Sequence, residues 1–403
     1  MKTLDGVWVA AVVLASTPAA WAQTLYTGTG DPFPDEQHVL ELINRARANP
    51  TAEGTRLSIP GGIGEGLTAG EVADIGPRPP LAMNAILLGI ARQHSQDMWL
   101  RDYFAHETLP PPSPALEPWD RATNAGYIWN QFAENIASGS SHTAGQLEDL
   151  LMVDQGYSGR GHRKSLLDIN TSPSWLVVRE VGVGYYQGTG SKTNIYRDVL
   201  TEDFGRRDTV GPFVLGVVYN DANGNNFYDP GEGMQGVTIQ LSTGGSFYAV
   251  SSYAGGYSFP ANTGGSITVQ ATGGQFGAVI ASKTVTPAFP GENVKVDFKL
   301  SDAGLADTDG DGMSDAWEIA KFGNLTQTAT GDADGDTYSN RAEFNAGTEP
   351  MSGASTPTPP TFPAPPSSPP PPSSTPKKSG GGGCGLTGLG VLLPLLLARL
   401  RRR

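Results

Sequence analysis

Cysteine is almost absent from this sequence of 403 residues, which contains a single one, Cys384. A disulfide bond within the chain is therefore excluded, although small secreted domains commonly depend on such bonds. An exported chain of this composition needs metal ions or a large core in their place. A cysteine nucleophile in a folded domain is also excluded, because Cys384 lies close to the C-terminal end.

Positive charge is scarce as well. The sequence has 27 lysine and arginine residues against 40 aspartate and glutamate residues, which gives a net charge of −13. This balance argues against non-specific binding of nucleic acid, which requires basic surfaces. It suits calcium, which prefers carboxylate oxygen.

Two common catalytic motifs are missing. The sequence contains neither His-Glu-x-x-His nor Gly-x-Ser-x-Gly. A zinc protease of the first type and a serine hydrolase of the second type are therefore unsupported.

The two ends of the chain have the composition of targeting segments. Residues 1–22 combine Lys2, an apolar run and the small-residue pattern Ala20-Trp21-Ala22, which is typical of a signal peptide. Residues 380–403 combine four glycines, an apolar run interrupted by Pro394 and three terminal arginines. That run is short for a stable membrane span. We therefore expect export, followed by cleavage or anchoring at the C-terminal segment.

Residues 31–208 have the pattern of a domain with both helices and strands. Apolar spacing predicts a helix over 38–48 capped by Asp35, and a second helix up to Arg101 capped by Asn84. Further predicted elements are a helix capped by Ser141 or Thr143, a short helix near His162, and a hairpin formed by residues 175–186 and 193–204. Helices outside and strands between predict an α/β/α sandwich in a chain of overall α+β class.

The sequence pattern changes after residue 212. Short β-rich runs separated by glycine-rich turns predict a small all-β sandwich over 212–300. Residues 305–350 contain an acidic repeat. Residues 351–379 are rich in proline, serine and threonine, which predicts an extended and largely disordered stalk.

The acidic repeat matches the ligand spacing of EF-hand-like calcium loops. Calcium requires six or more oxygen ligands, which such loops supply from positions 1, 3, 5, 7, 9 and 12, the seventh through a backbone carbonyl. Gly312 stands at the turning position of the first copy, and Thr337 replaces it in the second, where we expect strain. A solvated acidic linker is the alternative. The predicted ligands are Asp307, Asp309, Asp311, Met313, Asp315 and Glu318 in the first copy, and Asp332, Asp334, Asp336, Tyr338, Asn340 and Glu343 in the second.

A third loop of similar spacing opens the β region. Its asparagines make it less charged than the other two, and an ordinary β-turn without a metal is the alternative. The predicted ligands are Asp221, Asn223, Asn225, Asp229 and Glu232.

The first domain resembles the CAP superfamily (SCP/PR1-like) in its bacterial form. The resemblance covers about 175 residues and rests on motifs in the family's order. These are Leu42 to Arg47, Leu81-Ala82-x-Asn84, Tyr103-Phe104-Ala105-His106, Asp120-Arg121-Ala122, Ala125-Gly126-Tyr127, Ala133-Glu134-Asn135-Ile136-Ala137, Arg160-Gly161-His162-Arg163 and Val181-Gly182-Val183-Gly184.

The resemblance implies a cleft formed by two histidines and two acidic residues. His106, Glu134 and His162 match three of these positions. The family's usual Trp-x-x-Glu pattern is absent, so Asp154 is the nearest substitute for the second acid, and Glu148 is the other candidate. Zinc or another divalent ion in the cleft is implied in the same way. Bracing of the cavity by His106 and His162 through hydrogen bonds is the structural alternative.

The other segments have resemblances of their own. The β region resembles SdrD B-like spacer modules, and the acidic repeat resembles thrombospondin type 3 and dockerin-like repeats. The tail resembles GlyGly-CTERM-type sorting signals of Gram-negative bacteria, which implies a sorting protease, the membrane as a partner and a cell-surface or outer-envelope location. Cys384 is then either processed there or a bystander.

Three functions follow as hypotheses. In the first, the cleft binds an apolar, lipid or cell-envelope ligand while calcium stabilises the spacer modules. In the second, the same cleft holds a metal ion and hydrolyses a substrate, with Glu134 as general base. In the third, the protein is a calcium-dependent adhesin. We expect binding rather than an established enzymatic activity.

Overall fold

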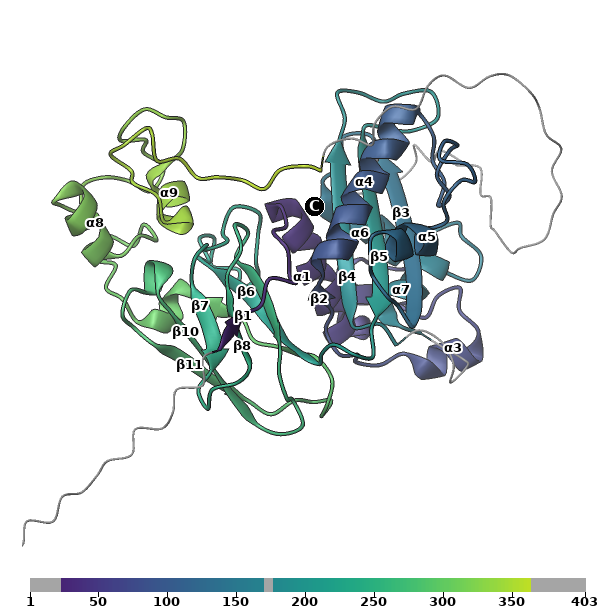
Figure 1. The fold of residues 1–403 in the computed structure, drawn as a ribbon, viewed down its shortest axis with the longest axis horizontal. Helices are drawn as coiled ribbons and strands as arrows, with labels where there is room; N and C mark the ends of the chain where they lie inside the picture. Colours follow the sequence, from purple (N-terminus) through teal and green to yellow (C-terminus); the bar gives the residue numbers. More distant parts are fainter. Residues whose placement is uncertain (1–22, 170–176, 364–403) are drawn as a thin grey trace, which may run out of the picture. The chain divides into compact units, whose positions relative to one another are not determined.

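The computed structural model describes residues 23–169 and 177–363, which belong to one compact unit (Figure 1). The predicted signal peptide and the predicted sorting tail lie outside these residues, as does Cys384. Within the described ranges, no helix is both long and apolar enough to cross a membrane.

The first part of the chain is built around a four-stranded sheet with the order β2-β4-β5-β3. Strands β4 and β5 pair in antiparallel register, as the predicted hairpin requires, and β5 also pairs with β3. The bounds are β2 (Ala82–Met83), β3 (Gln131–Gly139), β4 (Glu180–Gln187) and β5 (Asp198–Arg206).

Helices cover both faces of this sheet (Figure 1). Successive residues of a strand point to opposite faces, and β4 alternates glycine and valine accordingly. A Cβ atom on Gly182 or Gly184 would collide with the backbone of α4, so these glycines allow that helix to lie directly on the sheet. Val181 and Val183 instead join the core under the other helices. The helices are α4 (Ala85–Arg101) on the glycine face, and α1 (Pro34–Ala48), α6 (Ala144–Val153) and α7 (Gly161–Leu167) on the other.

The mixed α+β class is confirmed, whereas some element ends differ from prediction. Helix α4 begins after Asn84, whose side chain accepts hydrogen bonds from two backbone N–H groups, as expected. Helix α1 begins at Pro34, so Asp35 lies inside its first turn and is not its cap. The Glu36 carboxylate instead accepts the Phe33 N–H at 2.8 Å. Short helices not foreseen from the sequence are α2 (Pro50–Arg56), α3 (Ala69–Asp74) and α5 (Pro118–Asn124).

The β region contains two sheets that share one core. Val214 and Phe259 from one sheet meet Ile239 and Val269 from the other, and all four are fully buried. One sheet has the order β1-β8-β7-β10-β11, and in the other β6 pairs with β9, β12 and β13. The bounds are β1 (Thr24–Leu25), β6 (Phe213–Tyr219), β7 (Thr238–Leu241), β8 (Phe247–Val250), β9 (Gly256–Pro260), β10 (Ile267–Thr272), β11 (Ala281–Val285), β12 (Val294–Lys295) and β13 (Phe298–Lys299).

The first described residues belong to the β region and not to the first domain. Strand β1 runs parallel to β8, with Thr24 opposite Phe247. The chain therefore contributes to the β region both before and after it forms the α/β/α layers.

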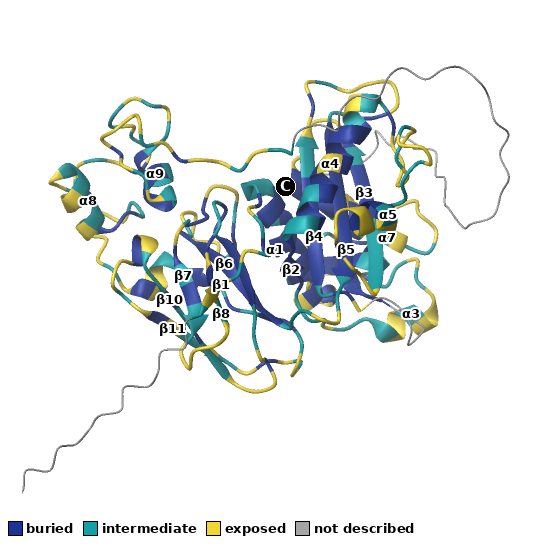
Figure 2. Cartoon of the chain, in the orientation of Figure 1, coloured by how far each residue is buried: buried dark blue, intermediate teal, exposed yellow. Residues whose placement is uncertain are grey.

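Two short helices follow the acidic loops: α8 (Asp315–Phe322) and α9 (Asn340–Ala346). Met313, Ala329 and Phe344 form a small cluster between them, against which Trp317 packs. Figure 2 shows how little of this region is buried compared with the strands of the two domains. A core this small suggests that the loops need another source of stability.

Candidate functional site

The structure brings His106 and Glu134 together at the edge strand β3. Nδ1 of His106 lies 2.7 Å from Oε1 of Glu134, whose carboxylate also accepts a hydrogen bond from Nη2 of Arg121. Arg121 in turn donates to the backbone oxygen of His106 at 2.7 Å. The Glu134 side chain is 1% exposed and that of His106 is 44% exposed. The result is a buried carboxylate held by an arginine, with one imidazole facing solvent.

The charges around Glu134 decide its protonation. Burial alone would raise the pKa of Glu134, but the charge of Arg121 and the hydrogen bond with His106 outweigh it and lower that pKa to about 2. His94 on α4 is fully buried, and burial lowers its pKa to about 3, so its imidazole is neutral. Nε2 of His94 lies 3.0 Å from the backbone oxygen of Ala105. His94 thus supports the loop that carries His106, in agreement with a core histidine.

The second predicted histidine pairs with the substitute acid. Nδ1 of His162 lies 2.8 Å from Oδ1 of Asp154, and the backbone N–H of His162 donates to Oδ2 of Asp154 at 3.0 Å. Asp154 is the left-handed C-cap of α6, with φ of 50°, which turns its carboxylate toward the start of α7. Glu148, the other candidate, is as deeply buried as Asp154 and lies beside Glu202.

The two histidine–carboxylate pairs approach β3 from different sides. Glu134 and Asn135 are neighbours on the strand, so their side chains point to opposite faces. Glu134 meets the residues near α4 and α5, whereas Asn135 donates to the backbone oxygen of His162 at 3.3 Å and to Glu202 at 3.2 Å. Among the described residues, no hydrogen bond or ion pair joins one pair to the other. The four predicted residues also form no group of converging metal ligands in this part of the chain.

The carboxyl groups of Glu148, Glu202 and Asp203 are also buried, and of these three only Glu148 was a candidate from the sequence. Glu202 of β5 and Glu148 of α6 are fully buried beside each other; burial raises the pKa of Glu202 to about 7, and burial and Glu202 raise that of Glu148. Asp203 stands opposite Glu134 in the strand register, and burial together with that neighbour raises its pKa. The signal for Glu202 and Asp203 in the sequence was the polar run Thr201-Glu202-Asp203 between the apolar residues Leu200 and Phe204.

The first acidic loop has the features of a calcium site. The side-chain oxygens of Asp307, Asp309 and Asp311 converge within 4.8 Å of one another. Glu318 is fully buried beside them, and neither of its carboxylate oxygens has a hydrogen-bond partner among the described residues. Burial and the three aspartates raise the pKa of Glu318 to about 7. Unpaired buried oxygens are costly, and a divalent cation at the aspartates would satisfy them.

Asp315 behaves differently from the other predicted ligands of this loop. Its carboxylate accepts hydrogen bonds from the backbone N–H of Thr308 at 2.7 Å and from the Thr308 hydroxyl at 2.6 Å. It closes the start of the loop onto α8. The backbone N–H of Met313 donates to Asp311 at 3.0 Å, which holds the seventh position in its turn.

The second loop repeats this arrangement. Asp332, Asp334 and Asp336 converge in the same way. Glu343 is fully buried, and burial with these aspartates raises its pKa to about 7. Buried oxygens without a hydrogen-bond partner in the described ranges belong to Asp334, Asp336, Asn340 and Glu343. The backbone N–H of Tyr338 donates to Asp336 at 2.8 Å.

The third predicted loop has its oxygens satisfied within the chain. Asn223 and Asn225 donate to Asp229 at 2.7 and 2.6 Å. Glu232 accepts two backbone N–H groups, and Lys299 lies 3.4 Å from Asp221. The ammonium group of Lys299 and the two asparagine amides therefore interact with the carboxylates that a metal ion would otherwise bind. Metal binding at this loop stays a prediction.

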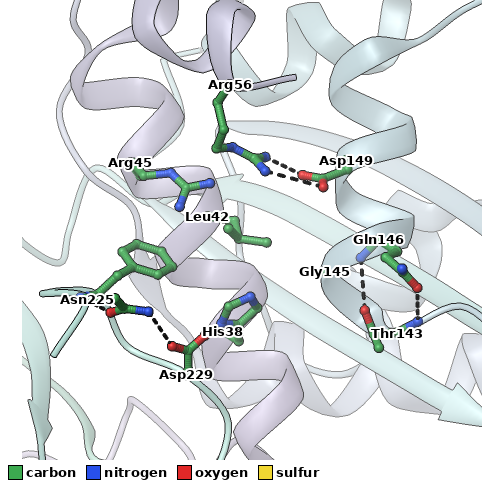
Figure 3. A pocket seen from close by; sticks show the side chains of 11 residues that line it. His38, Leu42, Arg45, Arg56, Thr143, Gly145, Gln146, Asp149, Asn225 and Asp229 are labelled. Atoms are coloured by element: carbon green, nitrogen blue, oxygen red, sulfur yellow. Dashed lines mark hydrogen bonds and ion pairs between the residues drawn. The ribbon is translucent and has the colours of Figure 1, made fainter. Parts of the chain in front are cut away.

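An open pocket of about 450 Å³ lies where this third loop meets α1 and α6 (Figure 3). Arg56 pairs there with Asp149, and the Asn225 amide donates a hydrogen bond to Asp229. Arg45 lies over the ring of Phe227, 4.4 Å from its centroid. The cavity includes Asn225 and Asp229 of the predicted loop but none of the four predicted cleft residues.

A family model and solved structures show similarity to parts of the chain. Residues 307–323 match the family model of the bacterial TSP3 repeat. A search of curated proteins found no match. One solved structure with a similar region is an extracellular protein containing an SCP domain from Bacillus anthracis str. Ames, with 21% identity, a TM-score of 0.27, and coverage of 43% of this chain and 40% of that one. Another is an outer surface protein from Borrelia burgdorferi, with 14% identity, a TM-score of 0.27, and coverage of 43% and 93%.

The match at 307–323 coincides with the first acidic loop and α8. The sequence-based interpretation of this loop as a thrombospondin type 3 repeat is therefore confirmed, and the converging aspartates of both loops favour calcium. This chain spans only 40% of the length of the Bacillus anthracis structure.

Proposed function

We propose that this is an exported, envelope-associated protein in which two calcium-loaded loops stabilise spacer modules and the α/β/α domain binds an apolar ligand. The observation that carries the calcium part is the pair of fully buried glutamates beside three aspartates each: both carboxylate oxygens of Glu318 and one of Glu343 have no hydrogen-bond partner among the described residues. Their acidic loops resemble sites whose ion contributes directly to folding.

Calcium at the loops would stabilise more than the loops themselves. The backbone oxygen of Gly312 accepts a hydrogen bond from Asn220 of the β region at 2.7 Å. Gln275 of the β region donates to the backbone oxygens of Phe344 and Asn345, both at 2.8 Å. These contacts join both loops to the β region. Calcium binding that orders the loops would therefore also stabilise the β region.

The apolar nature of the ligand is supported by the surface next to His106. The segment from Phe104 to Trp129 contains five large apolar side chains that are more than a third exposed. We propose that these side chains form one surface, because a contiguous exposed apolar patch commonly marks a binding site. The exposed fractions are 41% for Phe104, 39% for Leu109, 47% for Trp119, 72% for Ile128 and 37% for Trp129.

The hydrolase alternative receives less support. A general base works best when its pKa lies near the working pH, whereas the charge of Arg121 and the hydrogen bond with His106 hold the pKa of Glu134 at about 2. Zinc in this cleft would also compete with Arg121 for the carboxylate. His106 and Glu134 are therefore better suited to holding the loop around His106 in place than to activating water.

The remaining parts of the proposal rest on the sequence. The signal peptide would export the chain, and the tail at residues 380–403 would engage a sorting protease and the membrane. The Gram-negative outer envelope is the location that such a tail implies.

Binding of the full chain to phospholipid vesicles tests the ligand part. A variant in which serine replaces both Trp119 and Ile128 should bind roughly tenfold more weakly. This is the loss expected when binding no longer transfers large apolar side chains from water into the lipid. Ile280→Ser is the matched control, because Ile280 is 58% exposed but lies in the β region. Equal binding by all three proteins would contradict an apolar surface at this segment.

A further inference from the structure

The proline-rich segment after the acidic loops makes a specific contact with the first domain. Phe362, the single aromatic residue of 351–379, lies between Thr361 and Pro363. Its ring stacks on that of Phe33, with centroids 5.2 Å apart and planes at 28°. It also meets Tyr186 edge-on, with centroids 5.4 Å apart and planes at 89°. Both arrangements are favoured geometries for aromatic pairs.

The surface that receives Phe362 is built from three separate elements. Phe33 precedes α1, Arg92 lies in the middle of α4, and Tyr186 lies on β4. The guanidinium of Arg92 lies over Phe33, 4.5 Å from the ring centroid, and 5.9 Å from the ring centroid of Phe362. A cation near two aromatic faces adds a further attraction.

This surface is fixed by contacts that do not involve the proline-rich segment. Arg92 forms a buried ion pair with Glu36, in which Nε and Nη2 lie 2.9 and 2.5 Å from carboxylate oxygens. Nη2 also donates to the backbone oxygen of Asp31 at 2.9 Å. The ring of Tyr186 packs on Trp99, with centroids 5.6 Å apart. Because Phe33, Arg92 and Tyr186 are already held in place, docking of an aromatic ring on them costs little conformational entropy.

The segment itself is suited to such docking. Thr358-Pro359-Pro360-Thr361-Phe362-Pro363 favours an extended polyproline conformation, which loses little entropy on binding to an aromatic surface. Figure 1 shows the chain leaving α9 and running to the end of the described residues beside α1 and α4.

We propose that Phe33, Arg92 and Tyr186 form a docking site for an aromatic residue in a proline-flanked extended peptide, and that Phe362 of the same chain is its occupant. The chain then returns to the α/β/α domain before it enters the tail. If the tail is anchored, as the proposed function holds, the free chain between this domain and the tail begins at Phe362 and does not include the spacer modules. The docking itself does not depend on that anchoring.

Photo-crosslinking in the full chain tests the occupant. With p-benzoylphenylalanine at position 362, crosslinks should map to peptides that contain Phe33, Arg92 or Tyr186, within one chain. The same group at position 361, where the native threonine is exposed, should give a much lower yield at these peptides. Crosslinks to other regions only, or crosslinked dimers, would overturn docking within the chain.

A labelled peptide with the sequence of residues 356–364 tests the site. It should bind full-length F362A at least about tenfold more tightly than the wild type, whose site is filled. F362W should behave like the wild type, and F362A carrying Tyr186→Ala should lose the binding while keeping its thermal midpoint. Equal binding to wild type and F362A, or no binding to F362A, would overturn the proposal.

Discussion

Gly312 and Thr337 adopt the same left-handed backbone conformation at equivalent positions of the two acidic loops, with φ angles of +89° and +85°. Glycine has no Cβ atom and accepts this conformation readily, whereas a β-branched residue is strained there. The strain expected from the sequence at Thr337 is therefore present in the structure.

Thr337→Gly should relieve this strain. We expect the second loop to gain about 1 kcal/mol, which corresponds to roughly fivefold tighter calcium binding if the loop orders on binding. Calorimetric titration of the full chain measures this. The reciprocal change, Gly312→Thr, should weaken the first loop by a similar factor. Weaker calcium binding after Thr337→Gly, or tighter binding after Gly312→Thr, would refute the strain argument.

Calcium binding should depend on pH near neutrality. Burial and the neighbouring aspartates raise the pKa values of Glu318 and Glu343 to about 7, above the usual range of a glutamate. The calcium-free fold thus holds protons that the unfolded chain has already lost between about pH 4.5 and 7. Stability of the calcium-free form should fall as pH rises through 7, because both carboxylates then become charged.

Calcium should reverse this dependence, because the ion competes with those protons. Apparent affinity should decrease as the pH falls below about 7, and binding at pH 7 should release protons into the buffer. Titrations in buffers of different ionisation enthalpy measure the release. Glu318→Gln and Glu343→Gln should each reduce this proton release. A calcium affinity that does not change between pH 6 and 8 would be incompatible with these buried carboxyl groups.

Arg121 should be essential for the stability of the first domain. Arg121→Ala leaves the Glu134 carboxylate buried without its arginine and with His106 as its remaining side-chain hydrogen-bond partner, which should cost about 3–5 kcal/mol of unfolding free energy. Arg206→Ala is the matched control, because its ion pair with Asp208 is more exposed and should contribute less than about 1 kcal/mol. Denaturant unfolding compares the two. Similar losses in both variants would show that the buried pair has no special role.

Local patterns in the sequence predicted local structure well. The acidic loops could be assigned because their ligands are contiguous and their spacing is fixed by one ion. Helix α4 could be placed within one residue, because Asn84 supplies a cap directly before an apolar helical pattern. Strands β9 and β11 were missed, since glycine, proline and exposed polar residues interrupt their alternation.

The candidate cleft could be predicted only in part, because its partners are distant in sequence. The family resemblance named His106 and Glu134, but nothing in the spacing indicated that Arg121 would neutralise Glu134. That Glu134 and Asn135 point to opposite faces of the sheet could be inferred only from the structure, in which residues 131–139 form a strand. Composition predicted a loose stalk after residue 350 and gave no indication of the contact made by Phe362, which requires three elements of the folded first domain.

Calorimetric titration of the full chain with calcium tests the central claim most directly. The wild type should bind calcium at the two acidic loops and lose thermal stability when a chelator is added. A chain carrying both Glu318→Gln and Glu343→Gln should lose most of this binding, because each loop then lacks its buried carboxylate. Undiminished binding in that variant, or a thermal midpoint unaffected by calcium in the wild type, would contradict the account.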